Sequence, residues 1–219
     1  MYNWREIKYQ ALAWAEQTGG PPMVPVANYL LRLFKVSRAP VPVESFASQL
    51  GVRVLSATNF GSLEGALEHD SGQPTIWVNA GHSRTKKRFT IAHELGHLML
   101  HPEGKMFREL SYVGPFSQQK EEREANTFAA HLLMPLHFLE PFVGSKRMTD
   151  SYVAQAFEVS EAVLRWQLEA LRAQREALRD VVDRAAHERP PFFSALRSKS
   201  GSDCTGTLGF VRFFGVGAA

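Results

Sequence analysis

The feature that most constrains this chain is an H-E-x-x-H motif, His93-Glu94-Leu95-Gly96-His97, inside a helix predicted from about Arg84 to His101. Four residues advance a helix by about 6 Å and 400°, so the two histidines project from one face, about 40° apart. Two imidazole nitrogens placed in this way can reach one Zn²⁺ at about 2.0–2.1 Å. Glu94 lies about 100° round from His93, where it suits taking a proton from a water better than binding the ion.

The surroundings of the motif favour a metal site over a chance match. The neighbouring residues are small or apolar, as in a helix buried in a core: Phe89, Ile91, Ala92, Leu95, Gly96, Leu98 and Met99. Polar side chains are costly to bury there, and a metal ion would satisfy them. A catalytic zinc uses three protein ligands and keeps one open position, so a third ligand must come from elsewhere.

His101 is a poor candidate for that third ligand. On a continuous helix it lies about 12 Å along the axis from His93, too far for both to bind one ion. The H-E-x-x-H-x-x-G-x-x-H arrangement also fails, because Leu100 and Glu103 occupy its glycine and third histidine positions. We therefore expect His101 to support the site or to end the helix.

Glu124 is the better candidate. It lies near the middle of the next predicted helix, from about Gln118 to Met134, four residues before Phe128 on the buried face. Glu121 and Glu122 come earlier in the same helix, and Glu121 also lies near the apolar stripe. Spacing alone therefore favours Glu124 and leaves Glu121 as the alternative.

The rest of the chain predicts an α+β fold, with a small antiparallel or mixed sheet packed on the helices that carry the H-E-x-x-H zinc site, followed by a C-terminal helical region. Further helices are predicted over residues 2–17, 25–36 and 43–50, and from Thr149 to Ala186 with a turn at 158–160. Strands are predicted over 52–55, 60–68 and 74–79. Residues 102–117 are expected to form a loop, and 188–219 a disordered tail.

Composition restricts the compartment. Cys204 is the one cysteine, so no internal disulfide can form, and the chain has neither a signal-peptide pattern at its start nor an apolar run of about 20 residues. We expect a cytoplasmic protein with no membrane contact. The net charge of +3 is too small to identify a nucleic-acid binder.

Two runs of residues resemble the ImmA/IrrE family of bacterial and phage-borne zinc peptidases: Arg88 to His97 with His101, and Glu122 to Pro135. The resemblance covers roughly residues 25–185. It implies one zinc ion per chain held by His93, His97 and Glu124, with Glu94 as the catalytic base. It also implies a protein substrate, a helix-turn-helix repressor of a mobile element or a stress regulon.

On this basis we expect a zincin-like metallopeptidase domain over residues 1–145 and a helical extension over 146–187, packed on the catalytic domain. The proposed reaction is zinc-assisted peptide hydrolysis, in which Glu94 takes a proton from water and passes it to the leaving amine. A further group should stabilise the oxyanion, and the sequence does not choose among Tyr112, His131 and His101.

The helical extension carries two other patterns. Residues 153–168 resemble a helix-turn-helix, but Glu158 stands where a glycine is usual, and Glu161 and Glu169 flank Arg165, which argues against direct DNA binding. Residues 164–185 have heptad-like spacing, which fits self-association or packing on the chain's own domain. The competing hypothesis is a metal-bound, non-proteolytic regulator that binds a repressor or DNA through these helices.

Overall fold

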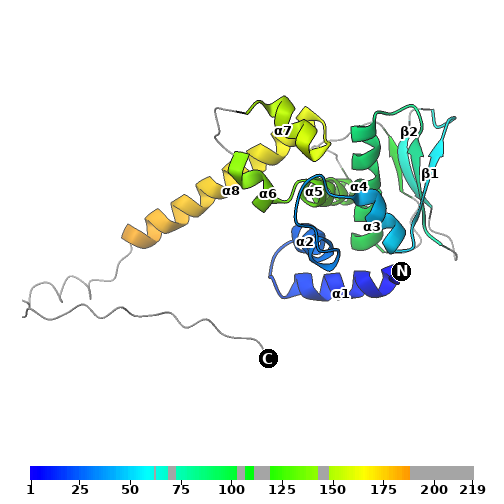
Figure 1. Ribbon diagram of the computed structural model, residues 1–219. Helices are drawn as coiled ribbons and strands as arrows, with labels where there is room; N and C mark the ends of the chain where they lie inside the picture. Colours follow the sequence, from blue (N-terminus) through cyan, green and yellow to red (C-terminus); the bar gives the residue numbers. More distant parts are fainter. Residues whose placement is uncertain (62, 69–72, 103–106, 111–118, 143–147, 188–219) are drawn as a thin grey trace, which may run out of the picture. The chain divides into compact units, whose positions relative to one another are not determined.

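The computed structural model describes residues 1–61, 63–68, 73–102, 107–110, 119–142 and 148–187 (Figure 1). Residues Met1–Ala173 form one compact unit, called the N-terminal unit below, and Gln174–Ala219 form a second. The helices before the H-E-x-x-H segment are α1 (Trp4–Glu16), α2 (Met23–Leu33) and α3 (Val43–Gln49). The later ones are α4 (Arg84–Leu100), α5 (Lys120–Leu133), α6 (Leu136–Leu139), the 3-10 turn η1 (Glu140–Phe142), α7 (Asp150–Phe157) and α8 (Glu161–His187).

A mixed sheet of four strands occupies one side of the N-terminal unit (Figure 1). The strands are β1 (Arg53–Ala57), β2 (Leu63–Glu68), β3 (Thr75–Asn79) and β4 (Phe107–Leu110), in the order β1-β3-β2-β4. β1 runs parallel to β3, whereas β2 is antiparallel to both β3 and β4. The α+β fold with a small mixed sheet, predicted from the sequence, is confirmed.

The prediction of a loop over residues 102–117 is wrong in part, because β4 lies within it. β4 pairs with β2 through an irregular register, with a shift between Leu63 and Ala66 of β2. Four residues at the edge of a sheet are too few to show a period-two pattern, and the pairing is with a distant strand. The rest of the predicted loop, apart from Pro102, lies outside the described residues.

The helices form layers behind the sheet, with α4 in the middle. α4 contacts β2 and β3 on one side and α5 on the other, and α5 in turn contacts α2 (Figure 1). The hydroxyl of Ser83 caps the first turn of α4 by accepting from the backbone N–H of Lys86. Every residue of α4 from Arg88 to Met99 is buried, so this helix crosses the core.

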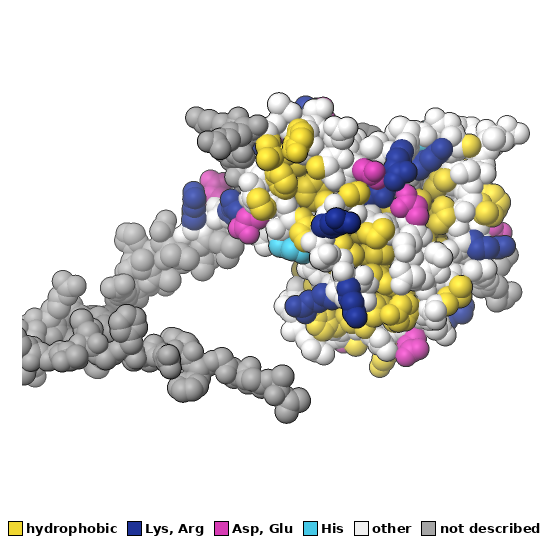
Figure 2. Space-filling model, viewed as in Figure 1, with side chains coloured by type: hydrophobic (Ala, Val, Ile, Leu, Met, Phe, Trp, Pro, Cys, Tyr) yellow, Lys and Arg dark blue, Asp and Glu magenta, His cyan; other side chains and the backbone are white. Residues whose placement is uncertain are grey.

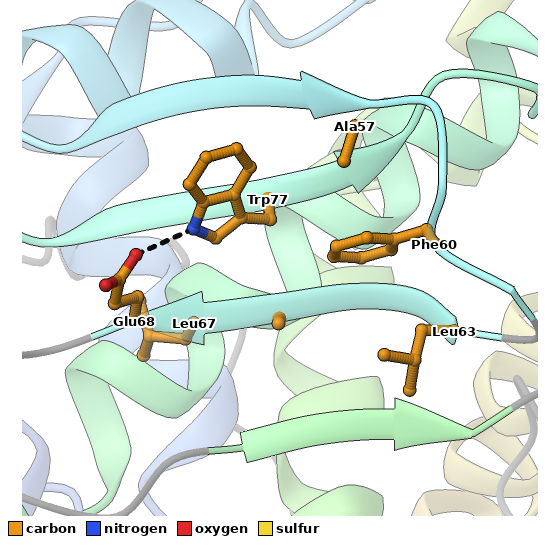
Figure 3. Close-up of a pocket in the computed structure, with 7 residues that line it drawn as sticks. Ala57, Phe60, Leu63, Leu67, Glu68 and Trp77 are labelled. Atoms are coloured by element: carbon orange, nitrogen blue, oxygen red, sulfur yellow. Dashed lines mark hydrogen bonds between the residues drawn. The ribbon is translucent and has the colours of Figure 1, made fainter.

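The outer face of the sheet, turned away from α4, carries a shallow apolar hollow (Figure 3). Its volume is about 390 Å³, and Phe60, Leu63 and Trp77 line much of it. The indole N–H of Trp77 donates to a carboxylate oxygen of Glu68 at 2.8 Å across the β2–β3 pair. This contact fixes the ring on the surface of the sheet.

α7 and α8 are separated by a short turn that begins at Glu158, which holds a left-handed conformation (φ 52°, ψ 48°). The Glu158 carboxylate lies 3.1 Å from Arg84 and 3.3 Å from Arg88, both on α4. Gln167 of α8 donates to the backbone oxygen of Met134, so the pair packs on the helical layers. The domain boundary predicted between residues 145 and 146 falls inside the N-terminal unit.

The apolar positions of α8 up to Leu171 are already used by this packing. Leu164 and Leu171 are buried, and Leu168 packs against the same core. The N-terminal half of the predicted self-association seam is therefore internal to the chain.

On the face shown in Figure 2, the charges of the described residues do not form one basic track. Figure 2 shows basic and acidic side chains scattered among hydrophobic ones on the visible face. On the first turns of α8, the Arg165 guanidinium lies 3.2 Å from Asp150 and 2.8 Å from Glu161, so its charge is balanced by two carboxylates. Within the described residues, none of the helices combines the length and the apolar character needed to cross a membrane.

Candidate metal centre

The site is built where α4 and α5 cross at Gly96 and Ala125. A Cβ atom on Gly96 would lie 3.1 Å from the Cα of Ala125 and 3.0 Å from the ring of Phe128. Only the smallest residue therefore allows the two backbones to approach this closely. The close crossing brings the first half of α5 over the H-E-x-x-H motif.

Three side chains converge at this crossing: His93 and His97 from α4, and Glu122 from α5. The Nε2 atoms of the two histidines are 2.9 Å apart. One carboxylate oxygen of Glu122 lies 3.2 Å from His93 Nε2, and the other lies 3.5 Å from His97 Nε2. Both imidazoles are buried.

These donors fit a zinc ion. Ligand atoms at about 2.0–2.1 Å from a tetrahedral ion are separated by about 3.4 Å, close to the three observed separations. Two imidazoles and one carboxylate are also a ligand set of catalytic zinc sites, which keep a fourth position open. Among the described residues, this is the group of three that can hold a metal ion.

Glu124, the predicted third ligand, is not brought into this group. Its carboxylate oxygen lies 3.1 Å from Nε2 of His101, at the C-terminal end of α4. Two residues along a helix correspond to about 200° of rotation, so Glu122 and Glu124 leave α5 in nearly opposite directions. Glu122, rather than Glu124, therefore lies beside the two histidines.

Glu94 is fully buried and lies between α4 and the sheet. A Cβ on Gly65 of β2 would come within 3.0 Å of Glu94 Oε1 and 2.3 Å of Thr90. The missing side chain at Gly65 thus makes room for both residues. The Glu94 side chain is thus enclosed by β2 on one side and by its own helix α4 on the other.

The other nitrogen of each histidine also has a partner. Nδ1 of His93 lies 2.8 Å from Oδ1 of Asn126, four residues after Glu122 on α5. Nδ1 of His97 lies 2.9 Å from Nδ1 of His101. His101 ends α4, as the sequence predicts, and its backbone oxygen accepts from the Lys8 ammonium of α1.

The pKa shifts of His97 and Glu122 favour the protonation states that bind a metal ion. Burial lowers the pKa of His97 to about 4, although its hydrogen bond with Glu122 opposes the shift. Burial acts to raise the pKa of Glu122, but the hydrogen bonds and charges of His93 and His97 outweigh it, so this pKa lies below its usual value. A neutral imidazole and an ionised carboxylate are the forms that bind metals.

Of the three candidates for stabilising the oxyanion, the described residues include His101, at the end of α4, and His131, on α5. Tyr112 lies outside the described residues. His131 follows Glu122 by nine residues on α5, about 13 Å along the helix axis. Burial lowers the pKa of His131 to about 4, so it is a neutral histidine at neutral pH.

Sequence reasoning missed Glu122 and Asn126. A signal was present in their spacing of four residues, which places an acid and an amide on one helical face. The amide holds one histidine and the acid faces both, which is the usual support of a metal-binding imidazole.

Comparison with known proteins shows which family and which proteins this chain is similar to. Residues 47–169, more than half of the chain, match the peptidase family model described as the IrrE N-terminal-like domain. A Bacillus phage phi105 protein named uncharacterized immunity region protein 2 is 33% identical over 106 residues, which cover 48% of this chain and 65% of that protein. The metallopeptidase ImmA of Bacillus subtilis (strain 168) is 29% identical over 76 residues, which cover 35% of this chain and 44% of ImmA.

The chain thus spans less than two thirds of the length of each of these relatives. The matched family region contains the whole sheet, the crossing of α4 and α5, and the three converging side chains. By this match over more than half of its length, the chain belongs to the IrrE N-terminal-like domain family of peptidases.

Proposed function

We propose that this protein is a zinc-dependent peptidase that holds one zinc ion through His93, His97 and Glu122. The observation that carries the proposal is the convergence of these three buried or half-buried donors at separations of 2.9–3.5 Å. At such sites zinc acidifies a water molecule and polarises the carbonyl of the scissile peptide.

In this proposal Glu94 is the general base. Its carboxylate accepts a proton from the attacking water and passes it to the nitrogen of the leaving amine. Asn126 holds the His93 ring in place, and the packing of β2 against α4 at Gly65 limits the movement of Glu94. Each of these groups is buried, which strengthens its electrostatic interactions.

The ligand set is tested by metal content, measured by mass spectrometry on purified wild type, Glu122→Ala and Glu124→Ala after zinc is supplied. We expect about one zinc per chain in the wild type, most of it lost in Glu122→Ala. Glu124→Ala should keep a zinc-binding site, because its carboxylate faces His101. Loss of zinc in Glu124→Ala with full zinc in Glu122→Ala would return the third ligand to Glu124.

We propose further that the substrate is a helix-turn-helix repressor of a mobile element or a stress regulon. Support comes from the similarity to an immunity region protein of a phage and to ImmA. The family resemblance of the motifs points to the same substrate class. We expect the reaction to take place in the cytoplasm, where such repressors act.

The variant Glu94→Gln distinguishes a peptidase from a non-proteolytic regulator. The variant keeps the size of the side chain and removes its basicity, so we expect zinc content to be unchanged and cleavage of a co-expressed repressor to fall by about 10²–10⁴-fold. If Glu94→Gln still inactivates the repressor without cleaving it, the protein acts by binding and the peptidase proposal fails.

A further inference from the structure

Two residues outside the three proposed ligands continue the hydrogen-bonded chain that starts at His97. His97 Nδ1 lies 2.9 Å from His101 Nδ1, and His101 Nε2 lies 3.1 Å from Glu124 Oε2. The His101 ring is buried, with 5% of the residue exposed, while Glu124 is half-buried. Glu124 also lies 3.5 Å from the exposed Lys120 ammonium on the preceding turn of α5.

We propose that Glu124 and His101 are positioning residues that set the tautomer and the ring orientation of His97, so that its Nε2 lone pair faces the metal. This inference rests on the proposed function, because it assumes that His97 is a ligand through Nε2. It also gives Glu124, which the sequence placed on the metal, a different role.

The proton positions follow from the geometry. A neutral imidazole carries one N–H and one lone pair. If His97 binds through Nε2, its proton must be on Nδ1, which then donates to Nδ1 of His101. The His101 proton is consequently on Nε2, where it donates to the Glu124 carboxylate.

The opposite arrangement is excluded by the carboxylate. If His101 donated from Nδ1 to His97, the proton of His97 would move to Nε2 and block the metal. The bare Nε2 of His101 would then face a carboxylate oxygen at 3.1 Å, two acceptors with no proton between them. The contact with the Glu124 carboxylate therefore selects the one tautomer of His101 that leaves His97 ready to bind.

The backbone around His101 supports this arrangement. The His101 backbone N–H donates to the His97 backbone oxygen at 3.1 Å, which closes the last turn of α4. The His101 backbone oxygen accepts from Lys8 of α1. His101 is thus fixed by α1, α4 and α5 together, as a residue that orients another side chain must be.

The test is zinc affinity, measured on the full chain by competition with a chelator. We expect Glu124→Leu and His101→Ala each to weaken zinc binding by about 10–100-fold, the range found when a partner of a ligating histidine is removed. The double variant should bind zinc no more weakly than His101→Ala alone, because Glu124 acts through His101. Glu124→Gln should restore much of the affinity, since its amide oxygen still accepts from His101.

Lys120→Ala is the matched control. It removes the ion pair of Glu124 but leaves the carboxylate on His101, so zinc affinity should be unchanged. Nitrogen-15 NMR of the zinc-free protein gives a second readout: the imidazole of His101 should be protonated at Nε2 in the wild type and become a tautomer mixture in Glu124→Leu.

The possible outcomes distinguish a failure of this inference from a failure of the proposed peptidase function. Zinc bound by Glu124→Leu within twofold of the wild type, or additive losses in the double variant, would overturn the positioning role and leave the peptidase proposal intact. A wild-type chain that binds no zinc would overturn both. Melting temperatures of the zinc-free variants check folding, and His101→Ala, with its expected loss of zinc affinity, keeps the test valid if Glu124→Leu does not fold.

Discussion

At the scale of single residues, Lys35 and Glu158 share an uncommon backbone. Both hold a left-handed conformation without being glycine, with φ of 53° and 52°. Such a conformation costs about 1 kcal/mol or more for a residue with a Cβ. Lys35 is exposed. The Glu158 carboxylate instead forms ion pairs with Arg84 and Arg88, and the Arg88 side chain is only 2% exposed.

This difference predicts opposite responses to glycine. Glu158→Gly relieves the backbone but leaves the buried Arg88 with less compensation, so we expect a loss of about 1–3 kcal/mol in the free energy of unfolding. Lys35→Gly relieves the same strain without breaking an ion pair with another described residue, so its change should stay within about 0.5 kcal/mol. Urea unfolding of both variants at pH 7 measures this. Equal losses would show that the ion pairs at Glu158 contribute nothing.

The choice between Glu122 and Glu124 also belongs to the residue scale, and the spacing of the apolar residues could not make it. The buried face of α5 is broad and includes residues such as Ala125, Asn126 and Phe128. A stripe this wide lets an acid on either flank point towards α4. Which acid meets the histidines depends on where the helices cross, which only the structure reveals.

At the scale of the elements, the crossing of α4 and α5 controls the site. Gly96→Ala gains about 1 kcal/mol of helix propensity but forces the new Cβ against the backbone of Ala125. We expect net destabilisation of up to about 2 kcal/mol and weaker zinc binding, because α5, which carries Glu122, must move away. Thermal unfolding and chelator competition measure the two effects.

Gly20→Ala is the control for this variant, since a Cβ there would meet nothing within 4 Å. It should leave zinc affinity unchanged. If Gly96→Ala binds zinc as tightly as Gly20→Ala does, then the close approach at Gly96 does not position Glu122.

Most elements were predictable because each carries its own signal. The period of α4 and α5, the cap at Ser83 and the stop at Pro135 are local features, and the structure begins and ends these helices within about two residues of the predictions. β4 carries no such signal. Its strand exists because β2 offers an edge to pair with, and that pairing is a long-range property of the fold.

At the scale of the whole molecule, all the candidate site residues lie in the N-terminal unit, Met1–Ala173. A chain ending at Ala173 should therefore bind zinc with the affinity of the full chain and melt within a few degrees of it. Loss of folding in the truncated chain would show that residues after 173 support the N-terminal unit.

The same truncation tests the self-association predicted for residues 164–185. Because Leu164 and Leu171 are buried in the N-terminal unit, self-association would have to use the later part of α8. Light scattering on the full and truncated chains gives the oligomeric state of each. A full chain that is a dimer and a truncated chain that is a monomer would support self-association through α8. Masses that differ only by the residues removed would contradict it.

The crossing at Gly96 and Ala125 has a consequence for how such a gene can change. Two neighbouring helices, α4 and α5, supply His93, Glu94, His97, Glu122 and Asn126, so the candidate centre is contained in residues 84–133. Recombination that exchanges the chain before or after this stretch keeps all five side chains together, provided that the incoming part keeps a glycine at the Gly65 position against Glu94. The flanking parts can then be replaced to suit different partners, while the chemistry is inherited as a single block.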